Sequence, residues 1–225
     1  DNFHSSLTNY NMVIFAKSGA GKSVTMKTLI SRSAVLMGIQ SLALDAEGEY
    51  SIVAESLGGI NVVLSPTSST VINIFDLETE IVKDEITGRE RLVLNVENKV
   101  EDVTQALLTM ARGSTRSQEV NELTKQIIAE SVSEEYASLG INGDPNSLYK
   151  TSNGSMGGNM LGKEKKEMPT IGSWYRRIQR KAEENKNQDY SFHYSYLLKV
   201  MKQYIREYDG QMAYFDGQST FDLLD

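Results

Sequence analysis

A glycine-containing loop between an apolar run and a helical pattern constrains this sequence more than any other feature. The apolar run 12–15 is followed by the loop 16–21, which reads Ala-Lys-Ser-Gly-Ala-Gly, and then by Lys22 and Ser23. From Val24 onward, apolar residues recur at helical spacing. A strand, a small-residue loop and a helix in this order predict that backbone N–H groups converge where the helix begins.

Residues 16–23 match the phosphate-binding pattern G-x-x-x-x-G-K-[ST] at every position but the first, where Ala16 replaces glycine. Alanine fits there if its φ is negative. Lys22 is expected to contact the β- and γ-phosphates as a catalytic residue, and the Ser23 hydroxyl is expected to bind Mg²⁺. The predicted nucleotide-binding residues are Lys17, Ser18, Gly19, Ala20, Gly21, Lys22, Ser23 and Val24. The alternative is a flexible turn without a ligand.

The next segments repeat the alternation of strand and helix. Apolar runs at 41–44 and 60–64 read as buried strands, and a short helix is expected from about 50 to 57 between them. Strands and helices at these spacings are typical of right-handed βαβ units and a parallel sheet. We therefore predict an α/β fold of the P-loop NTPase class.

Three carboxylates follow the second predicted strand in the turn Asp45-Ala46-Glu47-Gly48-Glu49-Tyr50. In a parallel sheet the strand ends face one crevice, so these acids are expected near the phosphates. Glu47 is the preferred active-site acid, ahead of Asp45, with a role in placing the attacking water or holding Mg²⁺ through water. The alternative is that the acids cap the following helix, and Glu49 is the expected cap.

The second half of the sequence predicts helices. One helix is expected at 100–111, and a second begins at a capping box of Thr115 and Gln118 and continues to about 136. A third helix is expected to start after Pro169-Thr170, and a fourth is expected along 194–208. A short strand is expected at 213–215, and a mobile loop at about 142–167. The predicted domains are the N-terminal part of a nucleotide-binding core over 1–99, a mostly helical subdomain over 100–209, and a return to the core over 210–225.

Composition excludes several other classes of protein. The 225 residues contain no cysteine and two histidines, which excludes a disulfide framework, a zinc ribbon and a cysteine nucleophile. The 23 Lys and Arg against 30 Asp and Glu give a net charge of −7, which argues against a protein dedicated to coating nucleic acid. No apolar stretch approaches the roughly 20 residues of a membrane helix, so we expect a soluble chain. A start at Asp1 without a leader suggests a piece of a longer protein.

Two patterns in the helical half have a structural and a functional interpretation. Arg176, Arg177, Arg180 and Lys181 form a basic helical face, which is expected to be solvated, with contact to nucleic acid or a partner as the alternative. The tyrosines between Tyr190 and Tyr208 follow the period of the aliphatic residues, so core packing is favoured over stacking on bases.

The order of these motifs resembles the C-terminal ATPase domain of conjugative type IV secretion ATPases, the TraE/TrbE/CagE-type family, within the HerA/FtsK group. The resemblance rests on segments spread over nearly the whole chain: residues 16–23, the turn 45–50, Asn73-Ile74-Phe75-Asp76, Pro169-Thr170, and Tyr214-Phe215-Asp216-Gly217. It implies a RecA-like parallel sheet with an inserted helical subdomain, ATP and Mg²⁺ as cofactors, and hydrolysis. By match, Gly19, Gly21, Lys22 and Ser23 bind nucleotide and Mg²⁺, and Glu47 is an active-site acid.

The resemblance also implies partners and a place in the cell. The partners are other type IV secretion components and, in the full-length protein, copies of the chain in a hexamer, with direct DNA binding left open. The location is the cytoplasmic face of the cell membrane, reached by peripheral association through partners.

No segment matches the family's Walker B acids or arginine finger, so the resemblance implies a chain truncated before the Walker B strand, with weakened hydrolysis. The alternatives are a HerA/FtsK-type DNA pump and a noncatalytic nucleotide-dependent interaction module.

Overall fold

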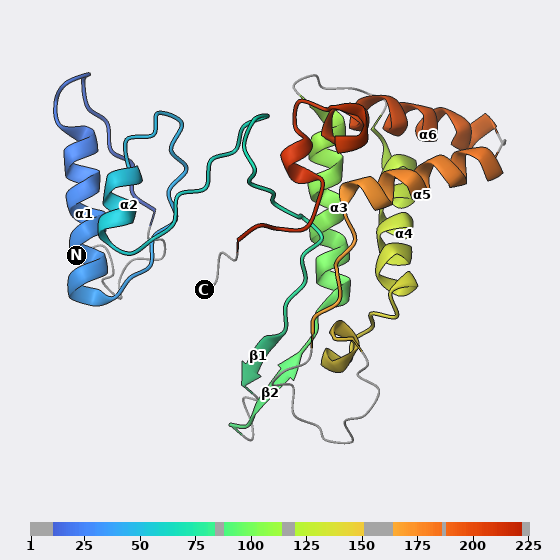
Figure 1. Cartoon of the computed structure of the whole chain (residues 1–225), viewed down its shortest axis with the longest axis horizontal. Helices are drawn as coiled ribbons and strands as arrows, with labels where there is room; N and C mark the ends of the chain where they lie inside the picture. Colours follow the sequence, from blue (N-terminus) through green and yellow to red (C-terminus); the bar gives the residue numbers. More distant parts are fainter. Residues whose placement is uncertain (1–10, 84–87, 114–119, 151–163, 186–187, 222–225) are drawn as a thin grey trace. The chain divides into compact units, whose positions relative to one another are not determined.

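The computed structural model describes residues 11–83, 88–113, 120–150, 164–185 and 188–221. The chain divides into two compact units, unit 1 with residues Asp1–Val62 and unit 2 with residues Val63–Asp225. Figure 1 shows α1 and α2 in the first unit and the remaining helices in the second. Within the described ranges, no helix is both long and apolar enough to cross a bilayer. The domain boundaries expected at 99 and 209 stay predictions.

The described part of unit 1 consists of two helices and irregular segments. Helix α1 spans Lys22–Met37 and ends at Gly38, whose φ of 64° is left-handed and whose N–H donates to the carbonyl of Ala34. Helix α2 spans Ser51–Ser56. Residues 11–62 contain no strand and no buried residue.

The strands expected at 12–15, 41–44 and 60–64 are therefore a wrong prediction for the described chain, and these segments do not form the RecA-like parallel sheet. A strand gains stability from hydrogen-bonded neighbours on the same sheet and from cover over its apolar face. These segments have neither: Phe15 is 89% exposed and Leu44 is 99% exposed. Apolar runs reveal the tendency to form a strand, but pairing decides whether one forms.

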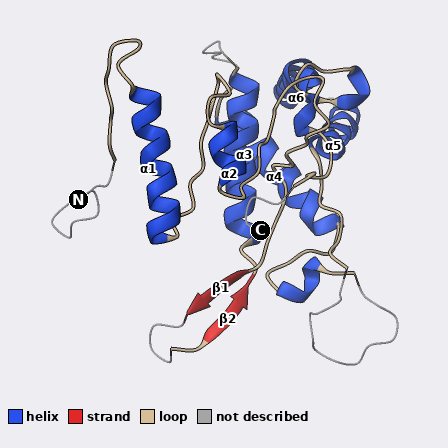
Figure 2. Cartoon of the chain, turned by 60° about the vertical axis from the view of Figure 1, so that its left-hand side comes forward, coloured by secondary structure: helices blue, strands red, loops and turns tan. Residues whose placement is uncertain are grey.

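Unit 2 is built around four helices, α3 (Val96–Arg112), α4 (Glu122–Ser138), α5 (Ile171–Glu184) and α6 (Gln188–Met201). Figures 1 and 2 show them side by side, with α3 next to α4 and α5 next to α6. The described part of the unit also contains four short 3₁₀ helices: Pro145–Leu148, Lys202–Tyr204, Arg206–Tyr208 and Ala213–Phe215. Three helices predicted in this half are confirmed, with shifted ends: α3, α4 and α5. The helix predicted along 194–208 is wrong beyond residue 201, because α6 ends at Met201 and two 3₁₀ helices follow, with an extended Ile205 between them.

The hydrophobic core lies between these four helices. Its largest fully buried side chains come from every helix and from two connecting segments: Phe75, Leu107, Ile128, Tyr136, Leu148, Ile171, Trp174, Ile178, Leu197 and Met201. Tyr194 and Tyr204 are buried as well, which confirms core packing for these two tyrosines. All the buried apolar residues among the described ones belong to unit 2.

Helix starts follow local capping chemistry. At the N-terminus of α5, the Thr170 hydroxyl accepts from the Ser173 amide and the Ser173 hydroxyl accepts from the Thr170 amide. Asn121 caps α4 by accepting from the Thr124 amide at 3.1 Å. Helix α4 therefore starts later than predicted, and Thr115 and Gln118 lie outside the described residues.

A polar network fastens α4 to α5. Glu135, only 6% exposed, accepts from Arg177 Nε at 2.5 Å and from Ser173 Oγ at 2.8 Å. Lys181 Nζ donates to Glu134 Oε1 at 2.6 Å. Half of the predicted basic face, Arg177 and Lys181, is thus paired with acids of α4.

An antiparallel hairpin extends from the bundle in Figures 1 and 2. It pairs β1 (Glu80–Lys83) with β2 (Glu90–Val93), and Ile81 lies opposite Leu92. It is the only sheet in the part of the chain that the structure describes.

The loop expected at 142–167 is structured at both ends. Leu148, in the 3₁₀ helix Pro145–Leu148, is fully buried, and Tyr149 forms an antiparallel bridge with Lys165. The Lys166 amide donates to the Leu148 carbonyl at 3.0 Å. The ends of the segment are thus tied to the core, and its mobility stays a prediction; the middle, 151–163, lies outside the described residues.

Three segments far apart in the sequence meet at the N-terminus of α5, and we call them the α5 junction: residues 71–75, 168–172 and 214–220. Asn73 Nδ2 donates to the Pro169 carbonyl at 2.8 Å, and the Ile72 amide donates to the Tyr214 carbonyl at 2.9 Å. The buried Asp216 accepts from the Gly172 amide at 2.8 Å. Residues Ala213–Phe215 form a 3₁₀ helix here, so the strand predicted at 213–215 is wrong: its amides bond locally instead of to a neighbouring strand.

Candidate nucleotide-binding site

The loop before α1 turns at two glycines that have left-handed φ values. Gly19 and Gly21 have left-handed φ values of 78° and 86°, and the Ala20 amide closes a turn onto the Lys17 carbonyl at 3.1 Å. A Cβ at either glycine would meet nothing within 4 Å, so conformation and not space calls for glycine here. Among the described non-glycine residues only Asp209 has a positive φ, so Ala16 has the negative φ expected of it.

The N-terminus of α1 has no side-chain cap from its own N-cap residue. Gly21 is its N-cap and makes no side-chain capping bond, and the first turn contains no acidic residue. The first N–H groups of a helix lack intrahelical acceptors, and the helix dipole adds positive potential there. Lys22 and Ser23 begin the helix, with Lys22 exposed and Ser23 half-buried. The arrangement is suited to an anion held by backbone amides and one ammonium group.

The acidic turn folds around Asp45. Its Oδ2 accepts from the Tyr50 amide at 2.8 Å, and its Oδ1 accepts from the Glu47 amide at 3.3 Å. These backbone hydrogen bonds, the one from Tyr50 above all, hold the pKa of Asp45 below its ordinary value. Glu47 and Glu49 are exposed. The prediction that Glu49 caps the helix is wrong, because Asp45 takes the amide at its start.

Within unit 1 the acidic turn lies against the helix that follows the phosphate loop. Lys27 Nζ, on α1, lies 5.6 Å from the centroid of the Tyr50 ring. A cation at this distance from an aromatic face is attracted to it. This contact joins the end of the acidic turn to α1, and the predicted position of the acids beside the phosphate loop stays a prediction.

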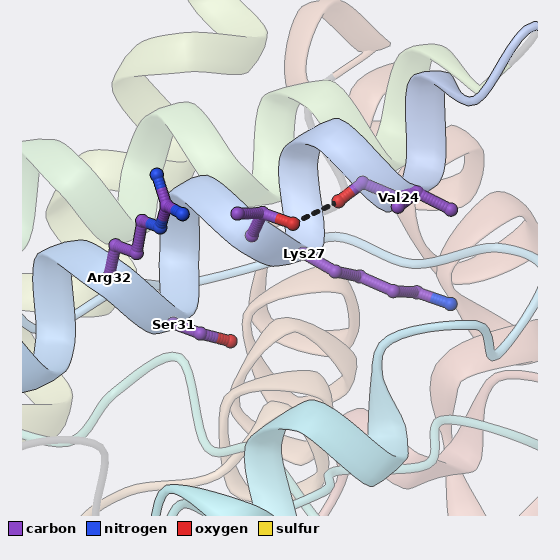
Figure 3. Close-up of a pocket in the computed structure, with 5 residues that line it drawn as sticks. Val24, Lys27, Ser31 and Arg32 are labelled. Atoms are coloured by element: carbon purple, nitrogen blue, oxygen red, sulfur yellow. Dashed lines mark hydrogen bonds between the residues drawn. The ribbon is translucent and has the colours of Figure 1, made fainter.

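A shallow hollow of about 400 Å³ runs along α1 and is lined by Val24, Lys27, Thr28, Ser31 and Arg32. Figure 3 shows these side chains on the one helix, with the Thr28 hydroxyl donating to the Val24 carbonyl at 2.8 Å. It shares only Val24 with the predicted nucleotide-binding residues. One wall is too little to enclose a ligand, so the loop and not the hollow defines the candidate site.

The donors at the loop fit a Mg²⁺–nucleotide complex. Ser23 supplies a hydroxyl oxygen, and no group of three or more His, Cys, Asp or Glu among the described residues gathers to hold a metal by itself. Mg²⁺ is often held by one or two protein oxygens together with substrate phosphates. At this site the Ser23 hydroxyl and the phosphates would both coordinate the ion.

Sequence reasoning located the loop and the turn but missed two contacts. The role of Asp45 was signalled by its position five residues before Tyr50, the N-cap of α2, since Asp side chains commonly bond nearby amides. The contact between Lys27 and Tyr50 has no sequence signal, because it joins residues from separate elements.

Comparison with known proteins identifies the family. A family model described as "Helicase HerA, central domain" matches residues 5–216. Neither a curated protein nor a solved structure matches the chain. Because the family match covers most of the chain, the chain belongs to the HerA central-domain family, whose members are generally P-loop ATPases, and this membership implies binding of a nucleotide and Mg²⁺.

Proposed function

We propose that the chain is the ATP-binding and ATP-hydrolysing motor domain of a conjugative type IV secretion apparatus, where it energises channel or pilus assembly or substrate transfer. The observation that carries the proposal is the phosphate loop with its two left-handed glycines and the uncapped N-terminus of α1, in a chain of the HerA family.

The conjugative assignment goes beyond the family match and rests on motif order. Three of the segments that resemble the conjugation family, around Asn73, Pro169 and Asp216, contact one another at the α5 junction. Their convergence supports a shared structural role for residues that the sequence places far apart.

In this proposal the chain's own residues bind and orient the nucleotide. The amides of residues 18–23 and the Lys22 ammonium hold the phosphates. The Ser23 hydroxyl and the phosphates together would hold Mg²⁺, and Glu47 orients the attacking water. Asp45 fixes the backbone at Glu47 through the Glu47 amide. The bound Mg²⁺ would neutralise charge on the phosphates during transfer.

Equilibrium binding of a fluorescent ATP analogue with Mg²⁺ tests the site. Lys22→Ala should weaken binding at least tenfold, because it removes the charge that faces the phosphates. Arg32→Ala is the control, since it lies at the far end of the hollow on the same helix. Equal losses in the two variants, or none in Lys22→Ala, would place the nucleotide elsewhere.

Turnover separates a motor from a binding module. Glu47→Gln should lower kcat and leave the dissociation constant of ATP unchanged. Glu49→Gln should leave both kcat and the dissociation constant unchanged. ATP binding without any turnover in the wild-type chain would overturn the motor proposal in favour of a noncatalytic nucleotide-dependent module.

A second candidate is a DNA-pumping ATPase of the HerA/FtsK type, which the description of the matching family model favours. Stimulation of ATP turnover by double-stranded DNA would support the pump over the secretion motor.

For the secretion motor, we propose a homohexamer at the cytoplasmic face of the cell membrane, held there by other secretion components. Cross-linking of the protein in membranes would test this assembly.

A further inference from the structure

The turn between α4 and the 3₁₀ helix Pro145–Leu148 carries an Asn-Gly pair on the surface of unit 2. Asn142 and Gly143 are exposed, whereas Ile141 before them and Leu148 after them are buried in the core. No other Asn-Gly pair occurs in the part of the chain that the structure describes. A short exposed turn is thus held between two anchored ends.

Hydrogen bonds fix both the backbone and the side chain of Asn142. Its amide donates to the Ser147 hydroxyl oxygen at 3.1 Å. Its side-chain oxygen Oδ1 accepts from the Asp144 amide at 2.9 Å. Asn side chains commonly bond the backbone two residues further on in this way. The ring closed by this last bond contains both Cγ of Asn142 and the nitrogen of Gly143, so it folds the carboxamide over the next peptide unit.

The backbone nitrogen of Gly143 is accessible. The residue has no side chain to shield it, and a Cβ built there would meet nothing within 4 Å. The amide has no acceptor among the described residues. A nucleophilic nitrogen and a carboxamide carbon are therefore neighbours on an open surface.

We propose that Asn142 is a site of spontaneous deamidation and that the folded turn promotes the reaction. Hydroxide removes the proton of the Gly143 amide, and the nitrogen attacks Cγ of Asn142. The C–N bond of the carboxamide breaks, and ammonia leaves with a proton from water, which regenerates hydroxide. Water then opens the five-membered imide at either carbonyl and gives aspartate or β-linked isoaspartate. The reaction consumes one water and no other reactant.

Two properties of the turn favour the attack. The nucleophile and the carbonyl belong to one chain segment, so no second molecule has to be positioned. The Asp144 amide donates to Oδ1, the atom on which negative charge develops as Cγ is attacked, and a donor placed there stabilises that charge. The competing interpretation is that the same hydrogen bond protects Asn142 by holding its side chain still.

Both products change the surface, and one of them changes the backbone. Each adds a carboxylate to a chain with a net charge of −7. Isoaspartate also adds one backbone atom before Gly143, within the turn that leads Leu148 into the core. The inference rests on unit 2 alone and does not depend on nucleotide binding at α1.

Peptide mapping by mass spectrometry, after incubation of the full chain in mildly alkaline buffer, tests the proposal. Trypsin releases residues 126–150 as one peptide, which separates Asn142 from the second Asn-Gly pair of the sequence at 153–154. This peptide should deamidate at Asn142, with aspartate and isoaspartate as separate products, and the rate should rise with pH. Asn146, which precedes a serine in the same peptide, is the internal control and should react at least tenfold more slowly.

Matched variants separate the turn from the local sequence. Gly143→Ala should slow the reaction at least tenfold, because the added methyl group shields the nitrogen. Asp144→Pro removes the amide that donates to Oδ1 and should also slow it, whereas Asp144→Ala keeps this amide and should keep the wild-type rate. A synthetic peptide of residues 139–146 lacks the folded turn and should react more slowly than the chain. No reaction at Asn142, equal rates in the two Asp144 variants, or a peptide as fast as the folded chain would overturn the proposal.

Discussion

The backbone amide of Gly172 donates a hydrogen bond of 2.8 Å to Oδ1 of Asp216, and the two groups leave no space for a side chain. A Cβ at Gly172 would lie 2.6 Å from Oδ1 and 2.8 Å from Oδ2 of Asp216. Oδ2 also accepts from the Arg206 amide at 3.0 Å, so one buried carboxylate joins the start of α5 to the last 3₁₀ segments.

Gly172→Ala should lower the free energy of unfolding of unit 2 by about 2 kcal/mol, because the added methyl group displaces a buried carboxylate from its amide donors. The higher helix propensity of alanine offsets part of the loss. Urea unfolding followed by the fluorescence of Trp174, the only tryptophan, measures the change. Gly143→Ala is the control, since nothing lies within 4 Å of its Cβ. Equal stability of the two variants would contradict the close approach.

Glu135→Gln should destabilise unit 2 by about 2–3 kcal/mol, because it leaves the Arg177 guanidinium, only 18% exposed, without its closest carboxylate. The matched change Glu134→Gln should cost about 0–1 kcal/mol, since the Glu134 side chain is 43% exposed. The same unfolding measurement applies to both. A larger effect from Glu134→Gln would reverse the order of importance argued from burial.

Leu148→Ala should cost about 2–5 kcal/mol, as expected for a leucine removed from a packed core. Leu44→Ala, at a side chain that is 99% exposed, should leave the unfolding midpoint unchanged. An unchanged unfolding midpoint in Leu148→Ala would contradict the packing of this side chain in the core. It would support the mobile segment that the sequence predicted.

The carboxyl of Asp45 should titrate below 3.8, its ordinary pKa, because it accepts amide hydrogen bonds only in the folded turn. A depressed pKa stabilises the turn at pH values above the ordinary one, and this contribution is lost as the pH falls through the folded value. Carbon-13 NMR of the side-chain carboxyl gives the midpoint, and the Tyr50 amide signal should shift with it. A midpoint at or above 3.8 would contradict the hydrogen-bonded turn.

The helical half of the fold could be predicted because its signals are local. The apolar period and the Thr170 cap specify α5 within the chain segment that forms it. The absence of strands from residues 11–62 could not be predicted in the same way. Phe15 and Leu44 show the apolar character of a strand whether or not a neighbour pairs with it. Leu148 was missed because one buried leucine among glycines and polar residues gives no period.

For the candidate site, the sequence predicted the position of the loop and the negative φ of Ala16, and the loop's Gly19 and Gly21 have left-handed φ values. The position of the loop follows from the motif, whose glycines are needed at fixed positions. The roles of the individual acids did not follow, because the sequence does not show that Asp45 bonds the amides of the turn while Glu47 and Glu49 are exposed. The roles of Lys22, Ser23 and Glu47 in catalysis stay predictions.

The confinement of all described buried residues to unit 2 has a thermodynamic consequence. The heat-capacity change on unfolding comes mainly from apolar surface that becomes exposed to water. The described residues of unit 1 already expose their apolar side chains and add little to that change. A calorimetric scan of the chain should therefore show a heat-capacity step expected for a protein of unit 2's size and not for one of 225 residues.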